Sequence, residues 1–447
     1  MEVAATNKEY NIRSDKTDAD ARRLHSDYNG KLEVTPKCRI KSMDDFSIWY
    51  TPGVSAPCLD IEKDPSKVFV HTNRGNFVAI ISDGTRVLGL GDIGPEAALP
   101  VMEGKAILFK YLGGVDAFPI CIRTKDPDEI IKVCKWLEPT FGGINLEDIE
   151  APKCFYILKR LRKELNIPVW HDDQQGTASA TLAGLINALN VVGKTKEEVH
   201  TTLIGAGAAN ITICKLMIKY GFTPGNITLV DSKGIIHRDR PDLNSVVNPS
   251  KCELAMITNK DNRMGDATEA MKDADICIAL SKPGPGMVTR KMISSMASDP
   301  VVFACANPRP EIWPWEAKKG GARIVATGRS DFPNQVNNIL VFPAMFRGAL
   351  DVGARSITDE MCISGAEELA RYARVKGLSE NCILPTVEDW EVFPCVASEV
   401  AIKAVEQGMA RNNLTKDEAY QKAFNLIERS RKETNTLMDS GVIPAMA

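Results

Sequence analysis

Two pairs of adjacent carboxylates have the residue types and the spacing to hold a divalent cation. Glu147 and Asp148 directly follow one short apolar run, and Asp172 and Asp173 follow another. Neighbouring side chains diverge within a regular strand or helix, but both can turn toward one cation where a strand gives way to a helix. Carboxylate oxygens suit Mg²⁺ or Mn²⁺ better than zinc. The sequence therefore predicts a Mg²⁺ or Mn²⁺ site at two neighbouring strand ends; for either pair alone, a solvated acidic helix start is the alternative.

Lys105 and Tyr50 are the candidates for proton transfer. Lys105 lies one turn into a helix that we expect to begin at Pro100, among small and apolar residues. A lysine partly removed from water has a lowered pKa and can act as a base. Tyr50 precedes a Pro-Gly turn that would hold its phenol rigidly. A solvated helix lysine and a packing tyrosine are the ordinary alternatives.

A glycine-rich loop between two predicted strands has the features of a dinucleotide site. The strand 201–204, the loop, a helix to about Tyr220 and the strand 226–230 form a βαβ unit. Glycines there allow a tight turn and bring a pyrophosphate close to the helix N-terminus. We assign cofactor binding to Gly205, Gly207, Ala208, Ala209, Asn210 and Asp231. The third position of the motif is Asn210, where a small residue is usual because strand and helix are crowded there.

Three other segments carry polar groups for a ligand. Asn307 follows a predicted strand over 300–306, and Asn337 and Asn338 adjoin another apolar run. Loops at strand carboxyl ends line the crevice of such sheets. A second glycine string, 89–94, follows Arg86 but lacks an acidic residue at the end of a second strand. We assign that string to a substrate loop.

The whole chain has the composition of an ordinary globular protein. Its 447 residues exceed what one core usually supports, about 250–300 residues. We expect an α/β substrate and metal domain over 1–180, and a doubly wound Rossmann-type NAD(P)-binding domain with C-terminal helices over 181–447. The net charge of −3 without a long basic block excludes nucleic acid. No apolar run reaches the ~18 residues of a membrane helix, and 12 scattered cysteines without a secretory signal indicate a cytoplasmic location.

Eight segments occur in an order and spacing that chance does not explain. They are Tyr50–Val54, Leu88–Gly94, Met102–Lys105, Asn145–Asp148, His171–Ala178, Gly205–Ala209, Ala306–Glu311 and Phe332–Asn338. Together they resemble malic enzyme, in the small form typical of bacteria and archaea. The resemblance extends from about residue 22 to about residue 440.

The resemblance implies a reaction and a set of roles. The reaction is the oxidative decarboxylation of (S)-malate to pyruvate and CO₂ with NAD⁺ or NADP⁺ and Mg²⁺ or Mn²⁺. The implied metal ligands are Glu147, Asp148 and Asp173, and the implied catalytic groups are Lys105 as base, Tyr50 as acid and Asp172 beside them. Asn307 and Asn338 would hold the substrate carboxylates, with Asn307 and Asn337 also at the cofactor. A homodimer is implied, in which the N-terminal arm can deliver Tyr50 to the partner.

Two residue-level questions stay open in the sequence. Arg86 contacts either a malate carboxylate or a neighbouring acid. Asp231 should repel the 2′-phosphate of NADP⁺ and therefore favours NAD⁺. Lys233, Arg238 and Arg240 follow closely and could accept that phosphate. Of the two cofactors, the sequence slightly favours NAD⁺. His171 is interpreted as structural.

Two other functions compete with malate oxidation. A metal-free amino-acid dehydrogenase also pairs two domains with a catalytic lysine, but the acidic pairs argue against it. A catalytically inactive dinucleotide-binding protein is disfavoured because Lys105, Tyr50 and all the expected ligands are present.

Overall fold

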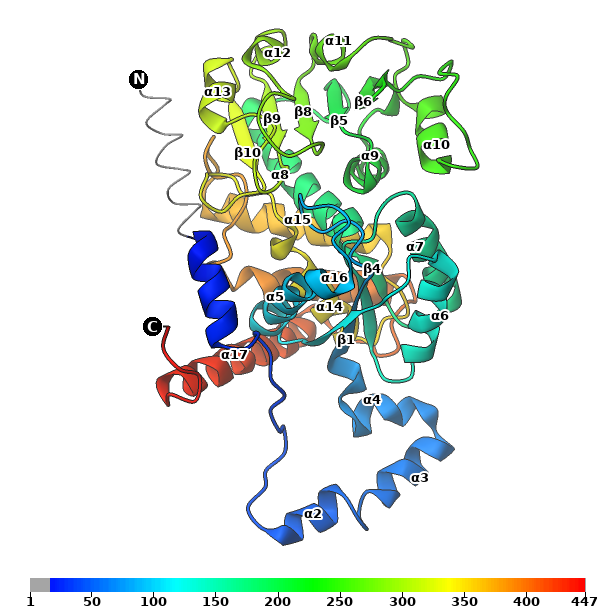
Figure 1. The fold of residues 1–447 in the computed structure, drawn as a ribbon, viewed down its shortest axis with the longest axis vertical. Helices are drawn as coiled ribbons and strands as arrows, with labels where there is room; N and C mark the ends of the chain where they lie inside the picture. Colours follow the sequence, from blue (N-terminus) through cyan, green and yellow to red (C-terminus); the bar gives the residue numbers. More distant parts are fainter. Residues whose placement is uncertain (1–16, 447) are drawn as a thin grey trace.

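The computed structural model describes residues 17–446, which form two sheets, a group of C-terminal helices and a projecting arm (Figure 1). Within these residues no helix is long and apolar enough to cross a membrane. The architecture is α/β with parallel sheets, as the sequence predicts.

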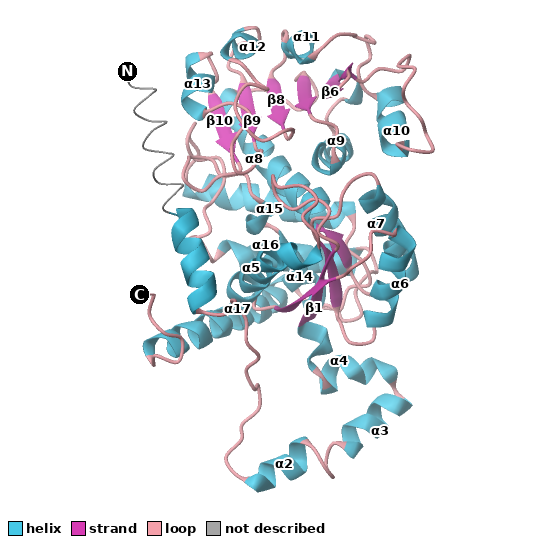
Figure 2. Ribbon diagram, in the orientation of Figure 1, coloured by secondary structure: helices cyan, strands magenta, loops and turns pink. Residues whose placement is uncertain are grey.

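The first sheet is fully parallel and has the order β2-β1-β3-β4. Its strands are β1 (Phe77–Ser82), β2 (Asp116–Cys121), β3 (Gly143–Leu146) and β4 (Val169–His171). The central strands are apolar on both sides because helices cover both faces. Helices α6 (Pro127–Leu137) and α7 (Lys153–Glu164) pack on one face, and α5 (Pro95–Gly113) packs on the other (Figure 2).

Helix α5 carries Lys105 and begins at Pro95, earlier than the expected start at Pro100. Gly94 precedes it with φ of 83°, and Pro95 occupies the first helical position, where no backbone N–H is needed. These two residues set the true start, and Pro100 lies inside the helix.

The second sheet has the order β10-β9-β8-β5-β6-β7, with only β7 antiparallel. The strands are β5 (Thr201–Ile204), β6 (Ile227–Asp231), β7 (Gly234–Ile235), β8 (Ile276–Ala279), β9 (Val301–Ala304) and β10 (Ile324–Thr327). The helices along it are α8 (Thr177–Val192), α9 (Ala208–Tyr220), α10 (Pro249–Ile257), α11 (Ala267–Met271), α12 (Arg290–Ser294) and α13 (Pro314–Lys319). The chain leaves β5 toward β6 and returns to β8 on the other side, so the strand order reverses at β5. Ligands bind such sheets at the carboxyl ends beside this reversal.

The C-terminal helices return to the first sheet. They are α14 (Phe342–Asp351), α15 (Asp359–Lys376), α16 (Val392–Glu406) and α17 (Lys416–Asp439). The ring of Phe109 on α5 lies 4.7 Å from that of Phe342 and 5.2 Å from that of Phe346. Helix α14 therefore belongs to the same apolar core as α5. The expected boundary at residue 180 falls inside α8, and a division at that point stays a prediction.

An N-terminal arm projects away from both sheets (Figure 1). It contains α2 (Met43–Trp49), α3 (Ser55–Lys63) and α4 (Val68–His71), and none of these helices has a buried residue. Apolar side chains such as Ile48 and Trp49 are exposed on it, by 65% and 53%.

Candidate active site

The predicted carboxylates converge at the carboxyl ends of β3 and β4. Glu147 and Asp148 follow β3, and Asp173 lies in one wide helical turn, Asp172–Gly176, that follows β4. One oxygen from each of the three lies within 4.8 Å of the others. They meet because β3 and β4 are adjacent and parallel, so their carboxyl ends lie at the same edge of the sheet.

The surroundings of these three side chains fit a divalent cation. Asp148 has φ of 55°, and its N–H donates to Asp173 Oδ2 at 3.0 Å. Asn145 Nδ2 donates to Glu147 Oε2 at 2.8 Å. Asp148 Oδ2 is buried and has no partner among the described residues. Burial, followed by the charge of Asp173, raises the pKa of Asp148 to about 8. A hard cation with oxygen ligands would relieve this repulsion and satisfy the buried oxygen.

Lys105 lies at the edge of the carboxylate cluster and is 8% exposed. Its Nζ is 2.6 Å from Asp172 Oδ2, 3.0 Å from Glu147 Oε1 and 4.4 Å from the centre of the Phe342 ring. The expectation of a lowered pKa is wrong for this arrangement. Burial does lower the pKa of Lys105, but the carboxylates of Asp172 and Glu147 outweigh it and hold the pKa above its ordinary value. Lys105 is therefore an ammonium group that Glu147 links to the cation cluster.

Two side chains hold Asp172 by hydrogen bonds. Lys105 binds its Oδ2, and Trp170 Nε1 donates to its Oδ1 at 3.0 Å. A Cβ atom at Gly176 would lie 2.0 Å from Asp172 Oδ1 and 3.1 Å from Asn338 Cβ. Glycine at position 176 thus leaves room for the carboxylate and for Asn338, whose role as a substrate ligand stays a prediction.

His171 is the last residue of β4 and is fully buried. Its Nδ1 lies 3.7 Å from Asp173 Oδ2. Burial lowers the pKa of the imidazole, with the Asp173 charge acting in the opposite direction. A neutral ring packed behind Asp173 agrees with the structural role expected from the sequence.

Arg86 lies in the loop between β1 and α5. Its backbone N–H donates to the carbonyl of Asp148 at 2.9 Å. Among the described residues no acid pairs with its exposed guanidinium, so the alternative of a salt bridge to a neighbouring acid is not seen. Farther along the loop, a Cβ atom at Gly89 would lie 2.8 Å from the carbonyl oxygen of Asn307. The loop therefore contacts the second sheet at a residue expected to bind substrate.

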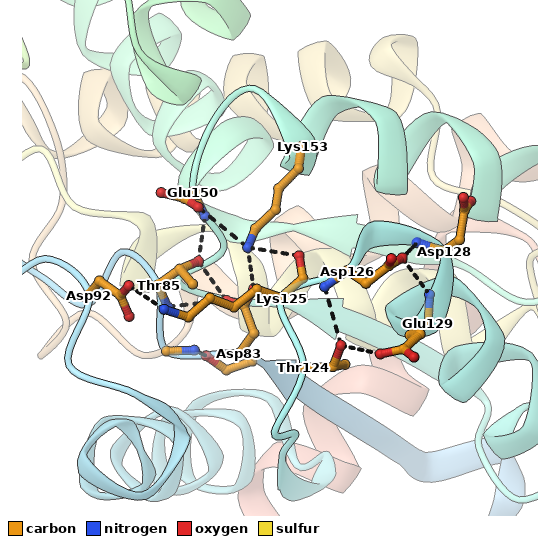
Figure 3. Close-up of polar contacts among 12 residues, drawn as sticks. Asp83, Thr85, Asp92, Thr124, Lys125, Asp126, Asp128, Glu129, Glu150 and Lys153 are labelled. Atoms are coloured by element: carbon orange, nitrogen blue, oxygen red, sulfur yellow. Dashed lines mark hydrogen bonds and ion pairs between the residues drawn. The ribbon is translucent and has the colours of Figure 1, made fainter.

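A network of polar contacts lies next to the loop between β1 and α5 (Figure 3). Lys153 Nζ lies 2.7 Å from Asp83 Oδ2 and 3.5 Å from Glu150 Oε1. Thr85 Oγ1 accepts from the N–H of Glu150 at 3.0 Å. The network ties the end of β1 to the segment after Asp148. None of these residues belongs to a local sequence motif, because side chains that meet across strands come from separate parts of the chain.

The nucleotide loop has the predicted shape at the carboxyl end of β5. Gly205 has φ of +97°, and a Cβ atom there would lie 2.4 Å from the carbonyl oxygen of Leu280. A Cβ atom at Gly207 would meet nothing within 4 Å. Helix α9 begins at Ala208, so its free N–H groups follow directly. The backbone at Gly205 lies close to Leu280, whereas the space beside Gly207 is open. The open space next to the helix N-terminus fits a dinucleotide pyrophosphate.

Asn210 has a structural contact that the sequence did not reveal. Its Nδ2 donates to the carbonyl oxygens of Ile204 at 3.0 Å and Gly205 at 2.8 Å, and the residue is 1% exposed. The side chain is turned toward the strand end, so it positions the loop and does not face a ligand. This explains how an amide is tolerated where a small residue is usual.

Asn337 and Asn307 differ in whether their side-chain amides are free to bind a ligand. Asn337 Nδ2 donates to the carbonyl of Gly328 at 3.2 Å, and its Oδ1 accepts from Ile339 N–H at 3.0 Å. Both polar atoms of its side chain therefore bind backbone groups, which argues against the expected direct contact with the cofactor. Asn307 is half-buried, and its Nδ2 lies 2.9 Å from where a Cβ atom at Gly328 would be.

Glu311 holds two of these loops together and was not assigned a role from the sequence. This buried carboxylate accepts from the N–H groups of Ser281 at 2.7 Å and Ala306 at 3.1 Å. Burial raises the pKa of Glu311 to about 6, although those donors oppose the rise. The loops after β8 and β9 are therefore fixed to each other at the mouth of the cofactor crevice.

Tyr50 is not brought to Lys105 within one chain. It directly follows α2 and is 70% exposed. Asp231 is likewise not a free ribose acceptor, because Arg240 and Lys251 pair with it.

Comparison with known proteins gives one consistent family. Residues 29–162 match the malic enzyme N-terminal domain, and residues 174–409 match the malic enzyme NAD binding domain. The bifunctional malic/malolactic enzyme of Bacillus subtilis is 50% identical over 91% of this chain and 98% of its own length. The NAD-dependent malic enzyme of Geobacillus stearothermophilus is 49% identical over 86% and 78%. Several relatives that are 42–44% identical are named NADP-dependent malic enzymes.

Solved structures of similar proteins indicate the same family. The crystal structure of Entamoeba histolytica malic enzyme superposes with a TM-score of 0.93 at 46% identity, covering 95% of this chain and 89% of that one. The competing assignment to the amino-acid dehydrogenases is not supported, since both domains match malic enzyme. The chain belongs to the malic enzyme family.

Proposed function

We propose that this chain oxidises and decarboxylates (S)-malate to pyruvate and CO₂, using NAD⁺ or NADP⁺ and Mg²⁺ or Mn²⁺. The observation that carries the proposal is the position of Lys105. Its Nζ lies 2.6 Å from Asp172 and 3.0 Å from Glu147, which is itself part of the carboxylate cluster. A lysine that could transfer a proton thus adjoins three carboxylates that could hold a cation, which supports the proposal.

The residues divide the work as follows. Glu147, Asp148 and Asp173 would hold the cation, which supplies a Lewis acid for the malate hydroxyl and for the enolate that follows loss of CO₂. Lys105 would accept the hydroxyl proton while Asp172 keeps its Nζ in place. Glu147 contacts Lys105 and also belongs to the group of carboxylates that would hold the cation. Binding of Glu147 to a cation would weaken its attraction for the Lys105 ammonium group and would therefore lower the pKa of Lys105. Asn307, Asn338 and Arg86 would orient the substrate carboxylates.

Tyr50 would donate the proton to C3 of the product from a second copy of the chain. Support comes from the arm, whose helices α2 to α4 bury no side chain in one chain and expose Trp49 and Ile48. Apolar surface of this kind is typical of an interface. A homodimer with an exchanged arm would cover it and bring the phenol to the partner's Lys105.

The 12 cysteines all lie within the described residues and are free thiols. This fits the cytoplasmic location expected from the sequence.

An initial-rate assay with (S)-malate, Mn²⁺ and each nicotinamide cofactor tests the reaction. We expect equal amounts of pyruvate and reduced cofactor, and loss of both on adding EDTA. Lactate should be measured too, because one relative is named a malic/malolactic enzyme. Malate oxidation that persists after complete removal of divalent cations would contradict the proposal.

Mixing two inactive variants tests the exchanged arm. Tyr50→Phe and Lys105→Ala subunits are combined after separate purification and partial unfolding. If Tyr50 acts in the partner, each mixed dimer has one intact site, and random pairing should restore about a quarter of wild-type activity. If both groups act within one chain, mixing restores nothing.

A further inference from the structure

Asp83 directly follows β1 and is buried, with an exposed fraction of 1%. Its Oδ1 accepts from the N–H of Thr85 at 3.1 Å and from the Thr85 hydroxyl at 2.6 Å. This is a turn in which an aspartate side chain binds the backbone two residues further along the chain. The turn begins the loop between β1 and α5, so the Asp83 carboxylate fixes the direction in which that loop leaves the sheet.

Lys153 pairs with the other oxygen of Asp83. Its Nζ lies 2.7 Å from Asp83 Oδ2, and its side chain is only 13% exposed (Figure 3). Lys153 is the first residue of α7, where the helix dipole disfavours a cation. A buried ion pair also loses the hydration of both charges, so its net contribution to stability is often small. The contact with Asp83 therefore explains the position of this lysine, and neither helix formation nor simple stability does.

Thr85 links Asp83 to the segment that follows β3. Its hydroxyl hydrogen is directed to Asp83, so its oxygen can accept from the N–H of Glu150, at 3.0 Å. Beside this contact, the N–H of Arg86 donates to the carbonyl of Asp148 at 2.9 Å. Two hydrogen bonds thus join the start of the loop between β1 and α5 to the segment that contains Asp148.

The backbone of Asp148 requires such support. It has φ of 55°, a conformation that a residue other than glycine keeps only when its surroundings hold it there. Its carboxylate is one of the three that could hold a cation. Loss of the contact at Glu150 would release the backbone two residues away and let this carboxylate move from the other two.

We propose that Asp83, Lys153 and Thr85 are positioning residues, which hold the segment of Asp148 against the start of the loop between β1 and α5 and thereby set the affinity of the site for a divalent cation. None of the three is among the carboxylates that would bind the cation. The inference rests on the proposed function, which places a cation at those carboxylates.

The direction of the effect distinguishes positioning from simple electrostatics. Lys153→Met removes a positive charge, so Coulomb's law alone predicts that the variant attracts Mn²⁺ more strongly. Positioning predicts weaker binding, because the uncharged methionine no longer holds the Asp83 carboxylate in place. The two explanations therefore predict opposite changes in the same measurement.

Calorimetric titration of the full-length protein with MnCl₂ alone tests the inference without turnover. Thr85→Val keeps the shape of the side chain but lacks the hydroxyl. We expect it to weaken Mn²⁺ binding by about tenfold, as is usual when an outer partner of a metal ligand is lost. Thr85→Ser keeps the hydroxyl and should bind Mn²⁺ within about threefold of the wild type.

Lys153→Met should also bind Mn²⁺ more weakly than the wild type. It leaves Asp83 buried and unpaired, which can prevent folding. Thr85→Val creates no unpaired charge, so it decides the inference by itself if Lys153→Met does not fold.

Thr202→Val is the matched control for Thr85→Val. Thr202 lies in β5 of the second sheet, is 1% exposed and donates its hydroxyl to the carbonyl of Ala270 at 2.6 Å. Both variants lose a buried hydroxyl and should unfold at a lower temperature than the wild type. Only Thr85→Val should bind Mn²⁺ more weakly.

Lys135→Met is the matched control for Lys153→Met. Lys135 on α6 pairs with Glu164 on α7 at 2.8 Å, at a more exposed position. Its replacement should leave Mn²⁺ binding unchanged.

The inference would be overturned by an unchanged Mn²⁺ affinity in Thr85→Val, by an equal loss in Thr85→Ser or Thr202→Val, or by unchanged or tighter binding in Lys153→Met. Failure of the wild type to bind Mn²⁺ would be a different result. It would overturn the proposed cation site, and this inference with it.

Discussion

Asp172 and Asp173 are adjacent in the chain, but their carboxylates lie in different clusters. Asp172 binds Lys105 at 2.6 Å, and Asp173 accepts from the N–H of Asp148 at 3.0 Å beside Glu147. The wide helical turn after β4 directs the two side chains apart. The end of β4 thereby contacts both Lys105 and the group of carboxylates Glu147, Asp148 and Asp173.

Replacing Lys105 by Ala should reduce malate oxidation by about 10²–10⁴-fold, the usual contribution of a proton-transfer group. Cofactor binding should be retained, because the nucleotide loop belongs to the other sheet. The variant should also lose up to about 3–5 kcal/mol of stability, since it leaves buried Asp172 and Glu147 without their cation. Steady-state kinetics and chemical unfolding measure the two effects.

Lys110→Ala provides the comparison for Lys105. Lys110 lies on the same helix and pairs with Asp116 and Glu433 at partly exposed positions. Near-normal turnover in Lys105→Ala, or an equal loss in Lys110→Ala, would contradict a proton-transfer role for Lys105.

Replacing Asp173 by Asn should raise the Mn²⁺ concentration needed for half-maximal activity by at least about tenfold, because one of three anionic ligands is lost. Direct Mn²⁺ binding to the isolated protein should weaken in parallel. Asp128→Asn removes an exposed acid on α6 that pairs with Arg160 and should have no effect. An unchanged Mn²⁺ titration in Asp173→Asn would remove Asp173 from the cation site.

Replacing Gly176 by Ala should impair activity through Asp172. The new Cβ atom would lie 2.0 Å from Asp172 Oδ1, so the carboxylate must move away from Lys105 or Trp170. Overpacking of this kind costs about 1–3 kcal/mol.

Gly104→Ala is the control for Gly176, since the nearest atom to its added Cβ would be Lys31 Nζ at 3.8 Å. It should stabilise α5 by about 0.5–1 kcal/mol. If Gly176→Ala were as active and as stable as this control, the close approach to Asp172 would have no functional importance.

Glu311 should make the stability of the cofactor loops depend on pH. Its pKa in the folded protein is about 6, compared with an ordinary value of 4.5. The group therefore contributes stability that is fully present below about pH 4.5 and lost as pH rises through about 6. The difference between the two pKa values corresponds to about 2 kcal/mol.

Urea unfolding of the wild type and Glu311→Gln between pH 4.5 and 7.5 measures this effect. The stability of the wild type relative to the variant should rise by about 2 kcal/mol toward the acidic end. A difference that stays constant over this range would mean that Glu311 titrates normally.

Much of the site could be predicted because it depends on strand ends. Short apolar runs followed by carboxylates predicted β3 and β4, and the rule that parallel strands end at one edge placed Glu147, Asp148 and Asp173 together. The spacing of Gly205, Gly207 and Asp231 predicted the βαβ unit in the same way. The start of α5 was misplaced, because Pro95 and Pro100 are both acceptable at a helix N-terminus and only Gly94 distinguishes them.

The α/β architecture, the residues at each strand end and the family could all be predicted from the chain, because each depends on the local order of residues. The charges around the candidate site residues could not be predicted, because they depend on how the chain folds. The pKa of Lys105 is raised because Asp172 and Glu147 reach it from other parts of the chain, and Asp231 is paired with Arg240 and Lys251. The charge of a buried group depends on neighbours distant in sequence, because burial and opposing charges at about 3 Å set its pKa. The local sequence does not contain those distances.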